Sequence, residues 1–169
     1  MNDVPTISSF AEHEWALYRD LRLRALGEAP DAFGSTFALE VTRSDAEWAV
    51  RLGNAMDARQ QMPLVARLGS VAIGLAWVRI QESDASVAHL YQVWVAPECR
   101  RHGAGKSLLD AAVDWARGIG ARQIELDVTC GDTPAMRLYV RAGFKPIGVP
   151  SPLRTGSTVL KQSMRLALG

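Results

Sequence analysis

The chain has 169 residues and a formal net charge of +1, with 19 lysines and arginines against 18 aspartates and glutamates. This length supports one sizeable core, so we expect a single domain over residues 1–169. The near balance of charge produces no field of one sign, which argues against a nucleic acid or an anionic membrane as partner.

The N-terminal residues Met1 to Phe10 have neither a basic start nor an apolar run, and no window approaches the length of a spanning helix. We therefore expect a cytoplasmic protein. The two cysteines, Cys99 and Cys130, form no metal-type cluster, so we expect reduced thiols and no metal site.

The first third of the chain has helical character. Apolar residues recur with helical spacing over residues 11–26, and Gly27 follows as a stop. A capping box from Ser44 to Glu47 predicts a second helix that runs to about Leu52. Residues 31–42 between the two helices are expected to form a loop that carries several apolar side chains.

Short β-rich runs come next. They cover residues 64–68, 71–80 and 87–95, with Gly69-Ser70 and the polar residues 81–86 as the turns between them. This pattern predicts an antiparallel meander.

Helices and strands alternate in the last third. The pattern predicts a helix from Gly105 to Gly118, a strand over 123–129, a helix from Thr133 to Gly143, and strands over 144–149 and 158–166. The complete order of elements predicts an α+β domain in which helices pack on a mixed sheet.

The segment from Val93 to Leu109 carries the strongest functional signal. A strand leads into a turn containing Gly103 and Gly105, and the turn opens an amphipathic helix. The first amides of a helix lack internal partners and lie at the positive end of its dipole, so they attract phosphate. Nearby positive charge comes from Arg100, Arg101 and Lys106. A glycine turn with solvated arginines explains the same residues, so the turn alone does not decide between the two interpretations.

Two blocks of the sequence resemble the GNAT acetyltransferases. Arg100-x-x-Gly103-x-Gly105 is similar to their pyrophosphate-binding signature, and Val93 to Pro97 is similar to their central strand. Leu138 to Phe144 resembles their later helix-and-strand signature, in the family's order and separation. The resemblance implies a mixed, mostly antiparallel sheet that is flanked by helices and splayed at a central parallel strand pair, residues 87–95 and 123–129.

Acetyl-CoA is the cosubstrate that this resemblance implies. In the family, the backbone of the central strand pairs with the pantetheine arm and the amides of the turn surround the pyrophosphate. Asp132 stands where the family often has asparagine, and an ionised carboxylate accepts hydrogen bonds but cannot donate them. The implied coenzyme-binding residues are Val93, Trp94, Val95, Arg100, Arg101, His102, Gly103, Ala104, Gly105, Lys106, Ser107 and Asp132.

Two side chains are candidates for proton transfer. Tyr139 corresponds to a tyrosine that lies near the coenzyme sulfur in many family members, where a phenol can act as general acid; a core tyrosine is the alternative. His89 lies where some members place a catalytic glutamate, and an imidazole can accept a proton at physiological pH. A strand histidine with a structural hydrogen bond is the alternative there. Glu125 and Asp127 are weaker candidates.

The acceptor wall implied by the same resemblance includes Phe33, Ser35 and Tyr91. The implied reaction is direct attack of a primary amine, on a small molecule, at the acetyl thioester. A protein or peptide acceptor and a non-catalytic acyl-CoA-binding module are the alternative functions. Dimers are common in the family, so a homodimer is a possible assembly.

Overall fold

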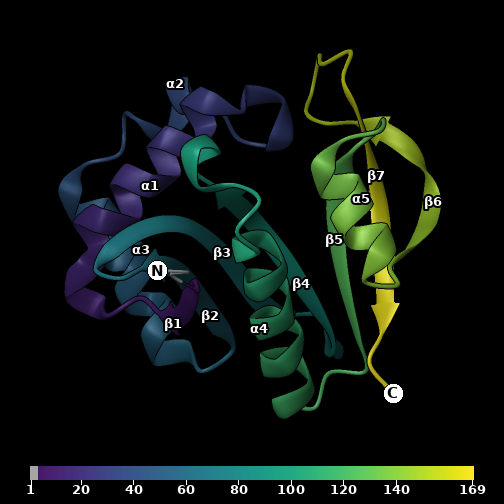
Figure 1. The fold of residues 1–169 in the computed structure, drawn as a ribbon, viewed down its shortest axis with the longest axis horizontal. Coiled ribbons are helices and arrows are strands. Elements are labelled where there is room, and N and C mark those ends of the chain that lie inside the picture. The colour runs from purple at the N-terminus through teal and green to yellow at the C-terminus, as the bar shows by residue number, and fades with distance from the viewer. Residues whose placement is uncertain (1–3) are drawn as a thin grey trace.

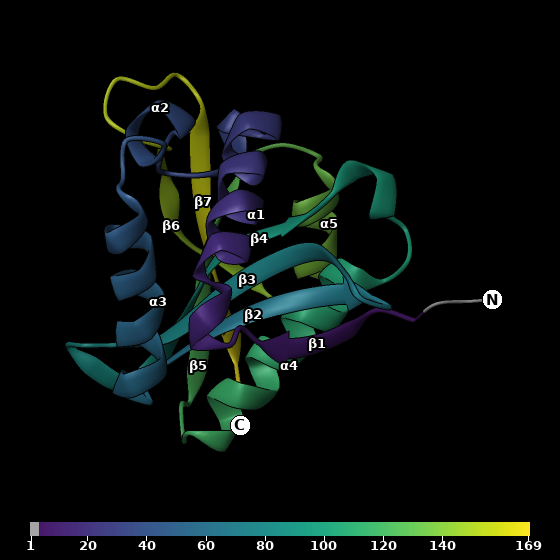
Figure 2. The ribbon, with the colours of Figure 1, turned by 90° about the vertical axis from the view of Figure 1, so that its left-hand side faces the viewer.

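The computed structural model describes residues 4–169, which form one seven-stranded sheet with helices on both faces (Figures 1 and 2). The strands are β1 (Thr6–Ser9), β2 (Gln61–Leu68), β3 (Val71–Gln81), β4 (Asp84–Val95), β5 (Gln123–Thr129), β6 (Lys145–Pro152) and β7 (Leu160–Ala167). The helices are α1 (Trp15–Glu28), α2 (Phe37–Glu40), α3 (Asp45–Ala58), α4 (Ala104–Gly118) and α5 (Pro134–Arg141). None of the helices in this part of the chain is long and apolar enough to cross a membrane.

The strand order is β1-β2-β3-β4-β5-β7-β6, and every neighbouring pair is antiparallel except β4 and β5. The predicted mixed, mostly antiparallel sheet with a central parallel pair is therefore confirmed. Helices α1 and α3 lie on one face of the sheet, and α4 and α5 lie on the other (Figure 2).

The sheet opens between its two parallel strands. β4 and β5 pair only from Val87–Gln123 to Leu90–Leu126. Beyond these pairs β4 remains bound to β3, while β5 remains bound to β7 as far as Thr129. The two strands diverge toward the top of Figure 1. Within residues 4–169, the edge of β4 that faces β5 thus has no strand partner after Leu90.

A β-bulge lies where this opening begins. Trp77 pairs with Tyr91 and Leu75 pairs with Trp94, so β4 holds one residue more than β3 between these pairs. Gln92 adopts a φ of 61°, which L-residues rarely adopt in a strand. Gly74 on β3 allows the close approach, because a Cβ there would lie 2.6 Å from the carbonyl oxygen of Trp94.

Each face of the sheet buries its own apolar cluster. The face under α4 and α5 packs side chains such as Leu108, Leu109, Ile124, Leu126 and Met164. The face under α1 and α3 packs Phe10, Tyr18, Trp48, Leu52 and Trp77, in which the ring of Tyr18 meets three other aromatic rings edge-on or tilted. The sheet therefore separates two apolar clusters.

The N-terminal caps of α3 and α5 form as the sequence predicts. The hydroxyl of Ser44 accepts from the amide of Glu47 (3.2 Å), whose carboxylate accepts from the amide of Ser44 (2.6 Å). The hydroxyl of Thr133 accepts from the amide of Met136 at 3.1 Å, with Pro134 at the first helical position. Both predicted helix starts are confirmed.

Several boundaries differ from the predictions. The sequence does not predict β1, because Ile7 is the one apolar residue of this four-residue strand and the strand is held by backbone pairing with β2. The short helix α2 lies within the segment expected to be a loop. α3 continues past Leu52 because Ala55 still packs into the core. β2 and β4 begin three residues before the predicted starts at 64 and 87, in pairing with β3.

The two edge strands differ from the central ones. β1 has only four residues. β6 is exposed along almost its whole length and contains Pro146, Pro150 and Pro152, and its pairing with β7 is irregular between Ile147 and Ser151.

Candidate functional site

The turn before α4 presents a group of free backbone amides. Arg101 (φ 69°) and Gly103 (φ 82°) both adopt left-handed conformations, and Gly103 caps the helix without a side-chain hydrogen bond. The first helical bond runs from the amide of Ser107 to the carbonyl of Gly103 (2.9 Å). Within residues 4–169, the amides from Arg101 to Lys106 donate to no acceptor. Such an array at the start of a 15-residue helix suits a diphosphate.

The glycines of the turn leave space for a ligand. A Cβ at Gly103 would have no heavy atom within 4 Å, and a Cβ at Gly105 would lie 3.6 Å from Leu138 of α5. Lys106 is largely exposed and its ammonium pairs with Asp110 at 2.6 Å. The residues of the turn therefore fit the pyrophosphate of coenzyme A, with backbone donors in front and positive charge around them.

Arg100 lies at this turn, but its guanidinium faces the protein. Nε donates to the carbonyl oxygen of Val95 (3.0 Å), and Nη2 donates to the carboxylate of Glu28 (2.9 Å). The indole of Trp94 donates to the same oxygen of Glu28 at 2.8 Å. Partial burial acts to raise the pKa of Glu28, but the hydrogen bonds from Trp94 and Arg100 hold that pKa below its ordinary value. The end of α1 is thus bound to the end of β4.

The side chains of Val93, Trp94 and Val95 pack in the apolar clusters on the two faces of the sheet. Trp94 and Val95 are buried and Val93 is partly buried, and Trp94 packs on the α1 side. What these residues offer at the opening is the backbone edge of β4. Asp132, in contrast, is exposed and pairs with Arg137 at 2.9 Å.

His89 and Tyr91 lie on one face of β4, with their rings stacked 4.4 Å apart. His89 is in register with Arg79 on β3 and with Glu125 on β5. Burial lowers the pKa of His89 below its ordinary value of 6.5, and the charges of Asp127 and Glu125 offset only part of that effect. The imidazole is therefore neutral at physiological pH and able to accept a proton.

The two carboxylates beside His89 each pair with a cationic side chain. Glu125 accepts from Arg165 at 2.6 Å, and Asp127 accepts from Lys161 at 2.8 Å and from Ser163 at 2.6 Å. Hydrogen bonding to Lys161 and Ser163 outweighs partial burial and lowers the pKa of Asp127. Both carboxylates are thus already hydrogen-bonded to neighbouring side chains.

Tyr139 lies on α5 with its ring buried against Phe144. Its hydroxyl has no hydrogen-bond partner in the described residues, yet it is not among the fully enclosed polar atoms. Burial raises the pKa of Tyr139 above its ordinary value of 10.0. The phenol is therefore protonated at neutral pH, as a proton donor must be.

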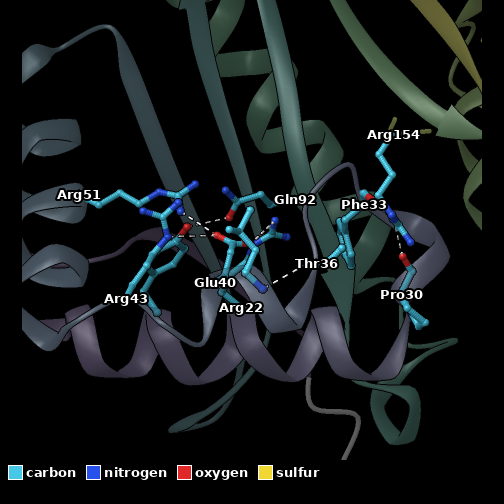
Figure 3. Close-up of polar contacts among 11 residues, drawn as sticks. Arg22, Pro30, Phe33, Thr36, Glu40, Arg43, Arg51, Gln92 and Arg154 are labelled. Atoms are coloured by element: carbon cyan, nitrogen blue, oxygen red, sulfur yellow. Dashed lines mark hydrogen bonds and ion pairs between the residues drawn. The ribbon is translucent and has the colours of Figure 1, made fainter. Parts of the chain in front are cut away.

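The segment between α1 and α2 meets the loop between β6 and β7. Arg154 of that loop donates to the carbonyl oxygens of Phe33 (2.9 Å) and Pro30 (3.2 Å), as Figure 3 shows. Phe33 itself is buried under the guanidinium of Arg22, Ser35 is partly buried, and Tyr91 is 36% exposed. Of the three predicted acceptor-wall residues, Tyr91 presents the most surface.

A charged cluster that the sequence did not reveal lies beside these residues (Figure 3). Glu40 is buried and is contacted by Arg22 (2.9 Å), Arg51 (2.9 Å) and Arg43 (3.8 Å). Arg22 is also buried, and it falls in the apolar stripe of α1. A charged residue within an apolar stripe was the available signal, but its partner, 18 residues away, depends on the path of the α1–α2 segment.

A comparison with protein families matches residues 16–144 to the acetyltransferase (GNAT) family. A mycothiol acetyltransferase of Beutenbergia cavernae is 31% identical over 138 residues, covering 82% of this chain and 42% of that protein. An aminoglycoside N(6')-acetyltransferase type 1 of Stenotrophomonas maltophilia is 29% identical over 148 residues, covering 84% of this chain and 87% of that protein.

Among solved structures, spermidine N-acetyltransferase from Vibrio cholerae, in complex with CoA and spermine, superposes with a TM-score of 0.79 at 17% identity. The match covers 98% of this chain and 96% of that one. The chain spans less than half the length of the mycothiol acetyltransferases that it matches. Because the family match covers most of the chain and the fold agrees, this chain belongs to the GNAT acetyltransferase family.

Proposed function

We propose that the chain transfers an acetyl group from acetyl-CoA to a primary amine of a small molecule. The observation that carries the proposal is the row of backbone amides from Arg101 to Lys106, which have no acceptor among the described residues and lie beside the opening between β4 and β5. The relatives support it, since their names refer to mycothiol, aminoglycosides and spermidine, and the Vibrio cholerae structure holds CoA.

Coenzyme binding uses mainly the backbone in this proposal. The amides of the turn bind the pyrophosphate, and Arg101, His102 and Lys106 surround it. The edge of β4 that faces β5, at Val93 and Val95, binds the pantetheine arm as an added strand would. Arg100 acts indirectly, because its guanidinium is already bound to Val95 and Glu28.

When bound, acetyl-CoA supplies the acetyl group. The amine nitrogen forms a bond to the carbonyl carbon and the C–S bond breaks. One proton leaves the amine, and one proton joins the thiolate. His89, neutral at physiological pH, accepts the amine proton directly or through a water. Tyr139, protonated at the same pH, donates the proton that the thiolate takes up.

Titration calorimetry with coenzyme A tests the assigned turn. Gly103→Glu adds a negative charge and a strained side chain at the pyrophosphate site, so it should abolish detectable binding. Gly120→Glu is the matched control: Gly120 also has a positive φ (91°) and open space, but it lies beyond the far end of α4. Equal affinity in the two variants would remove the basis of the proposal.

Thiol release from acetyl-CoA with a panel of amines tests catalysis. The wild type should release free thiol in the presence of at least one small amine, and Tyr139→Phe should lower kcat by about 10²-fold or more while retaining coenzyme binding. Coenzyme binding without turnover for any amine would instead favour the non-catalytic module.

A further inference from the structure

Residues 28–33, which follow α1, cross the opening between β4 and β5, and we call them the strap. At one end, the carboxylate of Glu28 accepts from the indole nitrogen of Trp94 on β4 at 2.8 Å. Further along, the carbonyl oxygen of Asp31 accepts from the hydroxyl of Thr129 on β5 at 2.5 Å. Trp94 and Thr129 lie on the parts of these strands that no longer pair with each other. The strap therefore joins the two sides of the opening.

The strap crosses the face of the sheet opposite α4. The side chain of Trp94 belongs to the apolar cluster under α1 and α3. On β5, Val128 packs in the cluster under α4, so the next side chain, Thr129, points to the face of α1. Tyr91 shares this face, because it is in register with Trp77 of the same cluster as Trp94. The proposed coenzyme turn opens α4, on the other face of the sheet.

Arg154 of the loop between β6 and β7 also binds the strap. Its Nη1 donates to the carbonyl oxygens of Phe33 (2.9 Å) and Pro30 (3.2 Å), as Figure 3 shows. The backbone that carries this side chain is itself fixed: Leu153 is buried, and the amide of Ser157 donates to the carbonyl oxygen of Arg154 at 3.0 Å. The strap is thus bound to β5 and to the β6–β7 loop as well as to β4.

The bonds to the strap determine its position more than they stabilise the fold. The bond from Thr129 to Asp31 and the bond from Arg154 to Pro30 both lie at the surface, where water could satisfy the same carbonyl oxygens. A segment held by few contacts opens at a small cost in free energy, and each added bond raises that cost. These bonds therefore keep the strap across the opening.

Resting on the proposed function, we propose that the strap restricts the acceptor to a small molecule, and that Arg154 and Thr129 determine this specificity by holding the strap in place. An acceptor that approaches the thioester from the face of α1 has to pass the strap. A small amine brings only itself past the strap. An amine that belongs to a peptide or a protein brings a chain that needs the space which the strap occupies.

Amide hydrogen exchange, followed by mass spectrometry, tests whether Arg154 holds the strap. Arg154→Met keeps the aliphatic stem and removes the two bonds to Pro30 and Phe33, so residues 28–33 should exchange about tenfold faster or more, with wild-type rates in α4. Thr129→Val keeps the shape of the side chain and removes one bond, so it should act in the same direction to a smaller extent. Unchanged exchange of the strap in both variants would overturn the proposal.

Two further variants separate the bonds of Arg154 from its charge. Arg117→Met is the matched control, because Arg117 is an exposed arginine of α4 whose guanidinium lies 3.9 Å from Asp114 and does not contact the strap. It should leave the exchange of residues 28–33 unchanged. Arg154→Lys retains a charged donor and should recover part of the protection. Equal acceleration in Arg117→Met and Arg154→Met would overturn the role of Arg154.

Thiol release with matched acceptors tests the restriction itself. The small amine with the highest kcat/KM is compared with the same amine attached by its far end to a short peptide, so that the nitrogen keeps its basicity. Wild type should prefer the free amine about tenfold or more, and Arg154→Met should reduce this preference about tenfold while changing the value for the free amine less than about twofold. An equal preference in variant and wild type, or a wild-type preference for the peptide, would overturn the restriction.

The two measurements distinguish this proposal from the proposed function. Faster exchange of the strap in Arg154→Met, without thiol release for any amine in wild type, would support the role of Arg154 and count against the catalytic proposal alone. Thiol release from a free amine, with unchanged exchange of the strap in the variants, would support catalysis and overturn the proposal for the strap.

Discussion

The phenol hydroxyl of Tyr18 donates to Oε1 of Gln92 over 2.9 Å. Tyr18 is fully buried on α1, and Gln92 is the bulged residue of β4 with a φ of 61°. This contact joins the core under α1 to the point where the central strands separate. The hydroxyl of Tyr18 therefore supports the left-handed conformation of Gln92. The ring of Tyr18 is itself packed against three aromatic rings.

Tyr18→Phe tests whether this hydrogen bond positions the bulge. The variant keeps the ring packing and loses one hydroxyl, so the free energy of unfolding should fall by only about 1 kcal/mol. If the bulge orients the backbone of β4 at the reaction centre, kcat should fall about tenfold with a smaller change in KM for acetyl-CoA. A variant with wild-type kcat and a normal denaturant midpoint would show that Gln92 needs no such support.

Glu28→Gln tests the link between α1 and the coenzyme turn. The substitution removes the charge that holds Arg100 and Trp94, so the end of β4 and the start of the turn should lose their fixed relation. We expect KM for acetyl-CoA to rise several-fold while KM for the amine stays constant. Glu98→Gln is the control, because Glu98 is an exposed partner of Arg24 and should have no effect on either constant.

The pH dependence of kcat/KM tests His89 as proton acceptor. Burial lowers the pKa of His89, so the imidazole stays neutral down to a pH below 6.5 and becomes protonated only as the pH falls further. Activity should therefore decline on the acid side with a midpoint below 6.5. His89→Gln should lower the plateau and remove this step; if the step persists in the variant, another group is responsible.

Gly74→Ala tests the close approach at the bulge. The added Cβ would lie 2.6 Å from the carbonyl oxygen of Trp94, a backbone atom that cannot move freely. We expect a loss of about 1–3 kcal/mol in the free energy of unfolding, measured with denaturant. Gly118→Ala, at a helical glycine with no atom within 4 Å, should be neutral or more stable by up to about 1 kcal/mol.

Local rules predicted much of this fold. The capping box at Ser44, the Thr133-Pro134 helix start and the glycine turn before α4 each depend on residues close together in the chain, and each forms as expected. The parallel strand pair followed from a family resemblance. The site residues, such as Tyr139 and His89, lie on the expected elements, but their roles remain predictions.

Features that depend on distant contacts were not predicted from the sequence. Gln92 lies in a run with ordinary strand composition, and only its register against β3 and its contact with Tyr18 reveal the bulge. The pairing of Arg22 with Glu40 was not predicted, because nothing local indicates that the chain between them folds back. Arg100 was expected at the coenzyme, whereas its guanidinium lies against Glu28.

The two margins of the sheet limit how copies of this protein can associate. β1 is too short to template a long strand, and the prolines and irregular pairing of β6 disturb the regular row of backbone donors and acceptors. Short edges, prolines and bulges are the devices by which β proteins avoid joining edge to edge. Assemblies of this chain should therefore form through helices, loops or side-chain surfaces, and the folded protein should resist growth into continuous intermolecular sheets.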